Sequence, residues 1–264
     1  MNDQNDPRIS IQGLHFYHGP QEILRGVTLN FYGGRHYILA GPNGAGKSTL
    51  IDLLAGLKKS TKGDIIVDGK PIGIYHPLDL ARILALAPQD FRLDFAFTVR
   101  EVVTMGRRPY LKRWGRLLPG DRKAVDLALN RLDISNLASK PVTTLSGGER
   151  QRTLLARTLA QEASIILLDE PTISLDITHA LTVMAEARAQ AEGGALVITV
   201  THDLNLGAAF GHEFIFLKDG QVVAAGPITQ AFTADILTRV YETEARVTLN
   251  DFTDSLIADF KKSV

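Results

Sequence analysis

The sequence predicts an α/β fold whose central sheet is mostly parallel. Three apolar runs, at residues 36–40, 164–168 and 195–201, each suit a single strand. The second run is nearly continuous rather than alternating, which is typical of a central parallel strand covered on both faces. Segments with helical periodicity lie between strands, and such alternation is typical of α/β proteins.

A glycine-rich loop follows the first of these strands. Residues 41–49, GPNGAGKST, fit the pattern G-x-x-x-x-G-K-[ST] that wraps nucleotide phosphates. Glycines allow positive φ angles, so consecutive backbone N–H groups can face one point. The predicted helix at 48–55 directs its positive N-terminal dipole at the same point. A chance glycine-rich turn is the alternative, and the flanking strand and helix argue against it.

Two side chains of this loop have predicted roles of their own. Lys47 supplies an ammonium for the outer phosphates, and the Ser48 hydroxyl is placed to ligate Mg²⁺. The sequence therefore predicts a site for a nucleotide with Mg²⁺. Its predicted nucleotide-binding residues are Gly41, Pro42, Asn43, Gly44, Ala45, Gly46, Lys47, Ser48 and Thr49.

Two carboxylates end the second apolar run. In open α/β sheets ligands lie at the carboxyl ends of strands, so we expect Asp169 and Glu170 to emerge beside the phosphates. Asp169 would hold Mg²⁺ through its water shell. Glu170 would orient and deprotonate the attacking water, a role in which general bases accelerate reactions by about 10²–10⁴. A strand followed by a surface acidic turn is the alternative.

The remaining elements are predicted in chain order. Residues 64–70 suggest short strands around an Asp-Gly turn, and hence an antiparallel β subdomain near the N-terminus. Apolar spacing from 98 to about 137 is helical. Residues 214–224 suggest a closing hairpin. No long linker or internal repeat interrupts the sequence, so one composite domain fits better than two independent ones.

A further segment, LSGGERQ at 145–151, makes a family resemblance plain. It opens a predicted helix at 149–160, whose first N–H groups offer a second anion site. Together with 41–49 and 165–170, it resembles the signature, Walker A and Walker B motifs of the ATP-binding subunit of an ABC transporter. The signature residues predicted to bind nucleotide are Ser146, Gly147 and Gly148.

The resemblance covers the chain from about residue 9 to 245 and implies its organisation. The expected fold is the ABC ATPase fold: a P-loop NTPase core, an N-terminal antiparallel β subdomain and an inserted helical subdomain. The ABC ATPase domain would occupy 1–245, with the helical subdomain at about 90–145. Two phosphate sites in one chain then imply a head-to-tail dimer, in which each signature covers the γ-phosphate held by the other subunit.

The resemblance also implies roles for single residues. Gln89 matches the Q-loop glutamine, which reaches Mg²⁺ and reports the nucleotide state to the membrane partner. Asp176 matches the D-loop, and His202 matches the switch histidine that contacts the γ-phosphate. Tyr17 is placed like the aromatic residue that stacks on adenine, with a surface or core aromatic as the alternative.

One stretch favours a subgroup of the family. EVVTMGRRPY at 101–110, followed by WGR at 114–116, is similar to the region after the Q-loop in importers of iron-siderophore, heme and vitamin B12. One alternative is a solvated basic segment, in which Arg107, Arg108 and neighbouring cations only keep the chain soluble. We rank a chelate importer first, a generic solute importer second and contact with single-stranded nucleic acid last.

The resemblance therefore implies the energy-coupling ATPase of an importer, bound peripherally to the cytoplasmic face of the cell (inner) membrane. Its expected cofactors are ATP and Mg²⁺. Its expected partners are a second copy of itself, polytopic permease subunits and, indirectly, a solute-binding protein. The alternative is a soluble ABC ATPase of translation or DNA repair, but this chain has one phosphate loop, one signature and no sustained heptad pattern.

Composition is compatible with this function. Lys+Arg and Asp+Glu are both 29, a balance that argues against a dedicated nucleic-acid binder. Cys is 0, so disulfides are excluded and a reducing compartment fits. We recognise no signal peptide at the start of the sequence and no stretch approaching the ~20 apolar residues of a membrane helix. Contact with a membrane is therefore expected through a partner.

The tail at 246–264 departs from the family pattern. Phe252, Leu256 and Phe260 recur at i, i+4 and i+8, which makes an apolar helical stripe. Asn250 or Asp251 could cap its start. We therefore expect a short helix docked on its own domain or, as the sharper alternative, across the dimer. Removing the residues after position 250 is then expected to lower thermal stability and leave the nucleotide chemistry largely intact.

Overall fold

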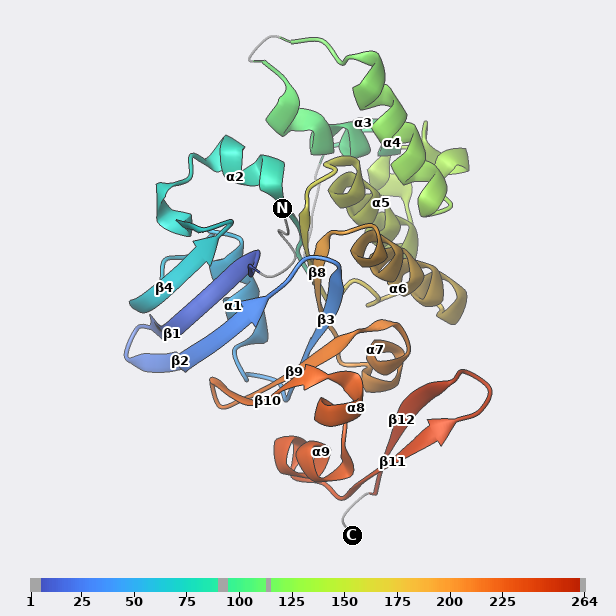
Figure 1. The fold of residues 1–264 in the computed structure, drawn as a ribbon. Helices are drawn as coiled ribbons and strands as arrows, with labels where there is room; N and C mark the ends of the chain where they lie inside the picture. Colours follow the sequence, from blue (N-terminus) through green and yellow to red (C-terminus); the bar gives the residue numbers. More distant parts are fainter. Residues whose placement is uncertain (1–5, 90–94, 113–114, 262–264) are drawn as a thin grey trace. The chain divides into compact units, whose positions relative to one another are not determined.

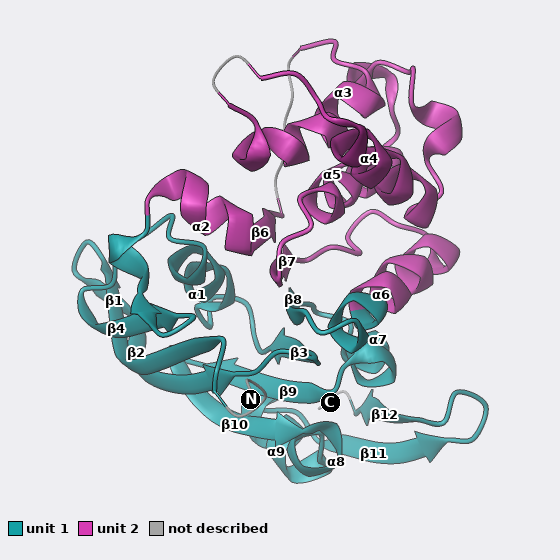
Figure 2. Cartoon of the chain, turned by 45° about the horizontal axis from the view of Figure 1, so that its top comes forward, with its two compact units in different colours: residues 1–75, 188–264 teal, residues 76–187 magenta. Residues whose placement is uncertain are grey.

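The chain forms two compact units. The computed structural model, drawn in Figure 1, describes residues 6–89, 95–112 and 115–261. Unit 1 comprises residues 1–75 and 188–264, and unit 2 comprises residues 76–187 (Figure 2). Unit 1 is therefore discontinuous in sequence, and unit 2 is inserted into it.

Unit 1 contains an antiparallel sheet with the strand order β2-β1-β4-β5 (Figure 1). The Asp68-Gly69 pair turns the chain between β4 and β5, with positive φ angles of 46° and 74° at its two residues. The predicted antiparallel β subdomain is thus confirmed. The strands are β1 (Ile9–His18), β2 (Gln21–Phe31), β4 (Lys62–Val67) and β5 (Lys70–Pro71), and a 3-10 turn, η1 (Ile72–Ile74), follows.

A second sheet in unit 1 leads into the phosphate loop. Its strands follow the order β10-β9-β3-β8, and β3 is parallel to both of its neighbours. Ile38 of β3 and Ile198 of β8 are fully buried, which explains the apolar run in each of these two strands. The strands are β3 (Arg35–Ala40), β8 (Leu196–Val200), β9 (Glu213–Lys218) and β10 (Gln221–Pro227). The helices are α1 (Lys47–Leu54), α7 (Leu204–Phe210), α8 (Ile228–Ala231) and α9 (Ala234–Tyr241).

Unit 2 combines a parallel strand pair with a cluster of helices. β6 (Leu84–Ala87) runs parallel to β7 (Ile165–Asp169), and the helices α3, α4 and α5 pack on one another. The helices and 3-10 turns are α2 (Pro77–Ile83), α3 (Val99–Thr104), η2 (Met105–Tyr110), α4 (Pro119–Arg131), η3 (Ser135–Leu137), η4 (Val142–Thr144) and α5 (Gly147–Ala160). Helix α6 (Ile177–Glu192) contains residues of both units. Over the described ranges, every helix is too short or too polar to cross a membrane.

The C-terminal tail is a hairpin, so the predicted helix at 246–264 is wrong. β11 (Ala245–Asn250) and β12 (Ser255–Phe260) pair in register from end to end. Asn250, the expected helix cap, makes a turn instead: its Oδ1 accepts from the backbone N–H groups of Phe252 at 2.9 Å and Thr253 at 3.3 Å. The apolar spacing that suggested a helix also places alternate residues of β12 on one face.

Candidate functional site

The phosphate-loop sequence forms a tight turn between β3 and α1. Gly41 has a φ angle of 146°, and a Cβ atom there would lie 1.9 Å from the carbonyl oxygen of Leu217. Gly46, the N-cap of α1, has a φ angle of 99°, and its Cβ would lie 2.8 Å from Cδ2 of Leu24. Only glycine fits these two positions, which gives the ends of the motif a steric reason.

Lys47 is the first residue of α1, and its side chain is buried. Its Nζ donates to the carbonyl oxygens of Gly41 at 2.8 Å and Pro42 at 2.9 Å. The ammonium is thus folded back onto the loop and adds positive charge to the N-terminal end of α1. Asn43, by contrast, is exposed, as is Ser48. This arrangement favours the binding of an anion at the phosphate loop.

In unit 2, the two predicted carboxylates lie at the end of β7, with Asp169 as its last residue and Glu170 directly after it, and both are buried. Asp169 is 6% exposed and Glu170 is 8% exposed, so the alternative of a surface acidic turn is wrong. The Gln89 Nε2 donates to the Glu170 Oε2 at 2.9 Å, which brings together two predicted residues that are 81 positions apart. Glu170 has a φ angle of 52°, in the left-handed region that non-glycine residues rarely occupy. A buried carboxylate held in this conformation points to a functional position.

Ser146 caps helix α5. The backbone N–H of Glu149 donates to the Ser146 Oγ at 3.2 Å, and the Ser146 N–H donates to the Glu149 carboxylate at 2.8 Å. The bond from the Ser146 backbone is the main reason that the pKa of Glu149 lies below its ordinary value. Ser146 and Gly147 are exposed. The N-terminal end of α5 is therefore both preformed and accessible.

The signature packs against the predicted D-loop within unit 2. A Cβ atom at Gly148 would lie 3.2 Å from the carbonyl oxygen of Ser174. Asp176 caps α6, since its Oδ1 accepts from the backbone N–H of His179 at 2.9 Å and contacts the His179 ring at 2.8 Å. The backbone bond from His179 is the main cause of the lowered pKa of Asp176. Asp176 is thus held in place by its own helix.

The other two predicted contacts lie in unit 1. His202 is exposed in the turn between β8 and α7, beside Asp203, which caps α7 by accepting from the Leu206 N–H at 2.8 Å. Tyr17 is exposed on β1, so it is not a core aromatic, and it lies opposite Glu22 of β2. A hydrogen bond to the Glu22 carboxylate is the main reason that the pKa of Tyr17 is raised. No sequence motif singles out Glu22, because its pairing with Tyr17 comes from the register of the two strands.

The predicted residues divide between the two units. Unit 1 contains the phosphate loop, Tyr17 and His202, whereas unit 2 contains Gln89, the two carboxylates, the signature and Asp176. Each unit therefore presents one glycine-rich helix N-terminus, at α1 in unit 1 and at α5 in unit 2.

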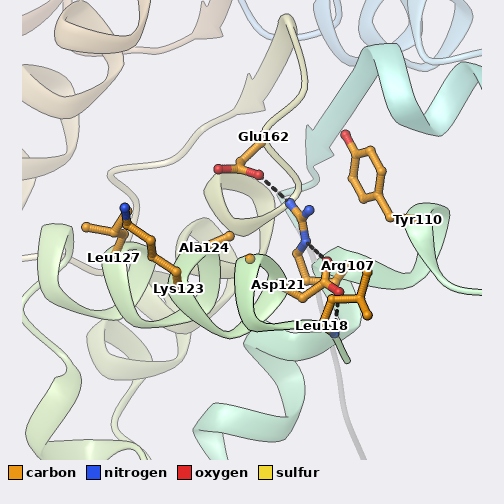
Figure 3. Close-up of a pocket in the computed structure, with 9 residues that line it drawn as sticks. Arg107, Tyr110, Leu118, Asp121, Lys123, Ala124, Leu127 and Glu162 are labelled. Carbon is orange, nitrogen blue, oxygen red and sulfur yellow. Dashed lines mark hydrogen bonds and ion pairs between the residues drawn. The ribbon is translucent and has the colours of Figure 1, made fainter. Parts of the chain in front are cut away.

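The chain from 101 to 110 is not a solvated basic segment, because Arg107 is buried with 7% exposed. Its guanidinium donates to Asp121 at 2.9 Å and to Glu162 at 2.7 Å (Figure 3). It also donates to the carbonyl of Ala160 at 2.8 Å and lies over the ring of Tyr110. These side chains line a cavity of about 570 Å³. Arg107 thus ties η2 to α4 and to the end of α5. Position 114, quoted with this stretch, lies outside the described residues.

The fold and the phosphate loop define the class of this chain, an α/β protein with a P-loop nucleotide site. The sequence profile of the ABC transporter family matches residues 24–173. The chain therefore belongs to the ABC transporter family.

Similar proteins narrow the position within the family. The hemin import ATP-binding protein HmuV of Rhodococcus jostii is 42% identical over 231 residues, which cover 87% of this chain and 78% of that protein. Among solved structures, an inward-facing ABC transporter of the metal-chelate type has a TM-score of 0.82 at 28% identity, covering 97% of both chains. A dimeric ATP-binding cassette bound to ADP and Pi in a post-hydrolysis state has a TM-score of 0.73 at 29% identity, covering 83% of this chain and 98% of that one. The predicted ABC ATPase fold is confirmed.

Proposed function

We propose that this chain is the ATP-hydrolysing, energy-coupling subunit of a membrane importer for a metal chelate. The observation that carries the proposal is the likeness over almost the whole chain to a hemin import ATP-binding protein and to a transporter of the metal-chelate type. The folded phosphate loop and the Gln89–Glu170 pair support it with chemistry. Iron siderophores, heme and vitamin B12 are the candidate chelates.

ATP hydrolysis requires a positioned water and stabilisation of the phosphate charge. We assign Glu170 the role of orienting and deprotonating that water, because its carboxylate is buried and the Gln89 amide holds it. Lys47 and the backbone N–H groups of its loop pair with the phosphates. His202 is assigned to the γ-phosphate, and the exposed ring of Tyr17 to the adenine.

The oxygen donors of the chain fit Mg²⁺. Unit 1 offers the exposed Ser48 hydroxyl, and unit 2 offers the Asp169 carboxylate and the Gln89 amide oxygen. Oxygen atoms of these kinds are the ligands that Mg²⁺ prefers. When bound, Mg²⁺ neutralises charge on the transferred phosphoryl group.

The preformed signature supports a dimer. Ser146 and Gly147 are exposed at the start of α5, and the ATP-binding cassette bound to ADP and Pi is itself dimeric. We propose a head-to-tail pair in which this helix end covers the nucleotide of the other subunit. The further partners are polytopic permease subunits and, through them, a solute-binding protein. These partners would hold the chain peripherally on the cytoplasmic face of the cell membrane.

Reconstitution tests the function. The chain is assembled in liposomes with the permease subunits that co-purify with it, and ATP turnover is measured with a hemin-loaded, siderophore-loaded or vitamin B12-loaded binding protein. We expect one chelate to stimulate turnover, with Glu170→Gln as the inactive control. A chain that assembles with ribosomes or DNA instead of a polytopic membrane protein would favour the alternative, a soluble ABC ATPase.

A further inference from the structure

The C-terminal hairpin of unit 1 has no role in the proposed mechanism so far. Phe252, in the turn between β11 and β12, is 95% exposed. At the other end, the Lys261 N–H donates to the Glu244 carbonyl at 3.0 Å and continues the pairing of the two strands. Ala258, in the middle of β12, is buried. The hairpin meets the rest of unit 1 through both strands, because β12 packs on α7 and β11 packs on α9.

Helix α7 packs on β12, and Asn205 of α7 binds that strand through both halves of its side-chain amide. Its Oδ1 accepts from the Ala258 N–H at 2.7 Å, and its Nδ2 donates to the Ala258 carbonyl at 3.4 Å. One carboxamide thus satisfies the two backbone groups that a further strand would otherwise satisfy. The contact covers the unpaired edge of β12 at Ala258 and holds α7 against this strand.

The same helix begins directly after the predicted switch histidine. The Asp203 N–H donates to the Thr201 Oγ1 at 3.1 Å, and Asp203 in turn caps α7. His202 stands between these two residues with its side chain exposed. Because α7 has only 7 residues, a tilt at Asn205 would move the turn that carries His202.

A second contact of β12 leads to the phosphate loop. Phe260 packs edge-on against Tyr241, with ring centroids 5.6 Å apart. Burial raises the pKa of Tyr241 to about 12, and the neighbouring backbone of Gly41, the first residue of the loop, partly offsets this rise. One strand therefore reaches both the phosphate loop and the turn of His202, through Tyr241 and Asn205 respectively.

We propose that the C-terminal hairpin is a positioning element of the ATPase site and that Asn205 is the residue through which it acts. By holding α7 on β12, Asn205 sets the place of His202 relative to the phosphate loop. The inference rests on the proposed function, because it requires His202 to contact the γ-phosphate. It reverses the sequence-based expectation that the tail leaves the nucleotide chemistry intact.

Steady-state ATP hydrolysis by the full-length chain tests the contact. Asn205→Leu keeps the branching at Cγ and removes both hydrogen bonds, whereas Asn205→Asp keeps the acceptor for the Ala258 N–H. We expect the kcat of Asn205→Leu to fall about tenfold, with the KM for ATP within about twofold of the parent, and the kcat of Asn205→Asp to fall less. Phe252→Ser, in the exposed turn, is the matched control and should keep the parental kcat.

A double-mutant cycle decides whether Asn205 acts through the hairpin. A chain that ends at Asn250 lacks β12, so it should show the same loss of kcat, and adding Asn205→Leu to it should cause no further loss. Should that chain not fold, Ala258→Pro removes the same N–H from the strand side and takes its place in the cycle. Asn205→Leu should also have little further effect in a His202→Ala background.

Two results would overturn the inference: an unchanged kcat in Asn205→Leu, or an equal additional loss when the hairpin is already absent. The parent chain and Glu170→Gln separate this failure from that of the proposed function. If the parent hydrolyses ATP with a dependence on Glu170 and Asn205→Leu matches it, only the positioning role fails. If the parent shows no hydrolysis that depends on Glu170, the proposed function itself fails.

Discussion

Replacing Glu170 by glutamine removes a proton acceptor and little else. The two side chains have the same shape, and an amide oxygen at position 170 can still accept the 2.9 Å hydrogen bond from Gln89. Loss of a general base lowers kcat by about 10²–10⁴, which corresponds to about 3–5 kcal/mol of activation free energy. A weakened hydrogen bond alone accounts for only about 1 kcal/mol. The magnitude therefore separates a catalytic from a structural role of Glu170.

The assay combines ATP turnover, nucleotide binding and size-exclusion chromatography. We expect Glu170→Gln to bind MgATP with a Kd close to that of the parent and to accumulate as an ATP-bound dimer, because closure no longer ends in hydrolysis. Glu162→Gln is the matched control, because Glu162 also has a φ angle of 52° but its side chain is 58% exposed. This control variant should have the kcat of the parent. Near-normal turnover in Glu170→Gln would remove this residue from the mechanism.

Three other perturbations test the dimer, the helices of unit 2 and the core of unit 1. Dimers mixed from Lys47→Ala and Ser146→Arg chains should regain part of the ATP hydrolysis that neither homodimer shows. In the mixed dimer, both lesions lie in one composite site and the other site is intact. No recovery despite confirmed mixing would argue against independent sites. Arg107→Ala should lower the free energy of unfolding, measured in urea, by about 2–3 kcal/mol, because it leaves the buried carboxylate of Asp121 without its cation. The control Arg108→Ala, at an exposed position, should change this free energy by less than ~0.5 kcal/mol. Equal effects of the two substitutions would contradict the ion-pair argument. Burial lowers the pKa of His36 from 6.5 to about 4, so the unfolded chain is protonated first as the pH falls. The contribution of His36 to the free energy of unfolding is therefore fully present above pH 6.5, and the free energy falls by up to about 3 kcal/mol towards pH 4. Thermal melts of His36→Gln should lack this decline with pH. An unchanged decline in that variant would assign it to other titratable groups.

Motifs whose geometry is local could be predicted from the sequence alone. The phosphate loop is one: Gly41 and Gly46 occur where the backbone requires positive φ angles and no Cβ, and the neighbouring residues are determined by the same turn. The Asp68-Gly69 turn and the capping box of Ser146 are others, because each involves residues no more than three positions apart. In these segments, side chains and backbone act over a few ångströms of the same chain.

Contacts between distant segments were decided by the tertiary structure. The sequence indicated Gln89 and Glu170 separately, but only the fold joins them. Arg107 looked like one cation among several until Asp121, Glu162 and the carbonyl of Ala160 were placed around it. The chemistry of such residues depends on what packs beside them, and no local pattern contains that information.

The C-terminal tail shows most clearly where prediction from the sequence ends. Its apolar residues suit a helix by their spacing of four, and they suit a strand by their alternation. So short a helix is marginal in water, and an isolated two-stranded hairpin is marginal as well. The choice between helix and hairpin therefore depended on tertiary contacts. Asn205 accepts a hydrogen bond from the backbone of β12, and Tyr241 packs against the ring of Phe260. The sequence by itself determined that the chain binds nucleotide phosphates, because that loop is built from adjacent residues; the tertiary structure determined the form of the tail, because its stability comes from residues elsewhere in the chain.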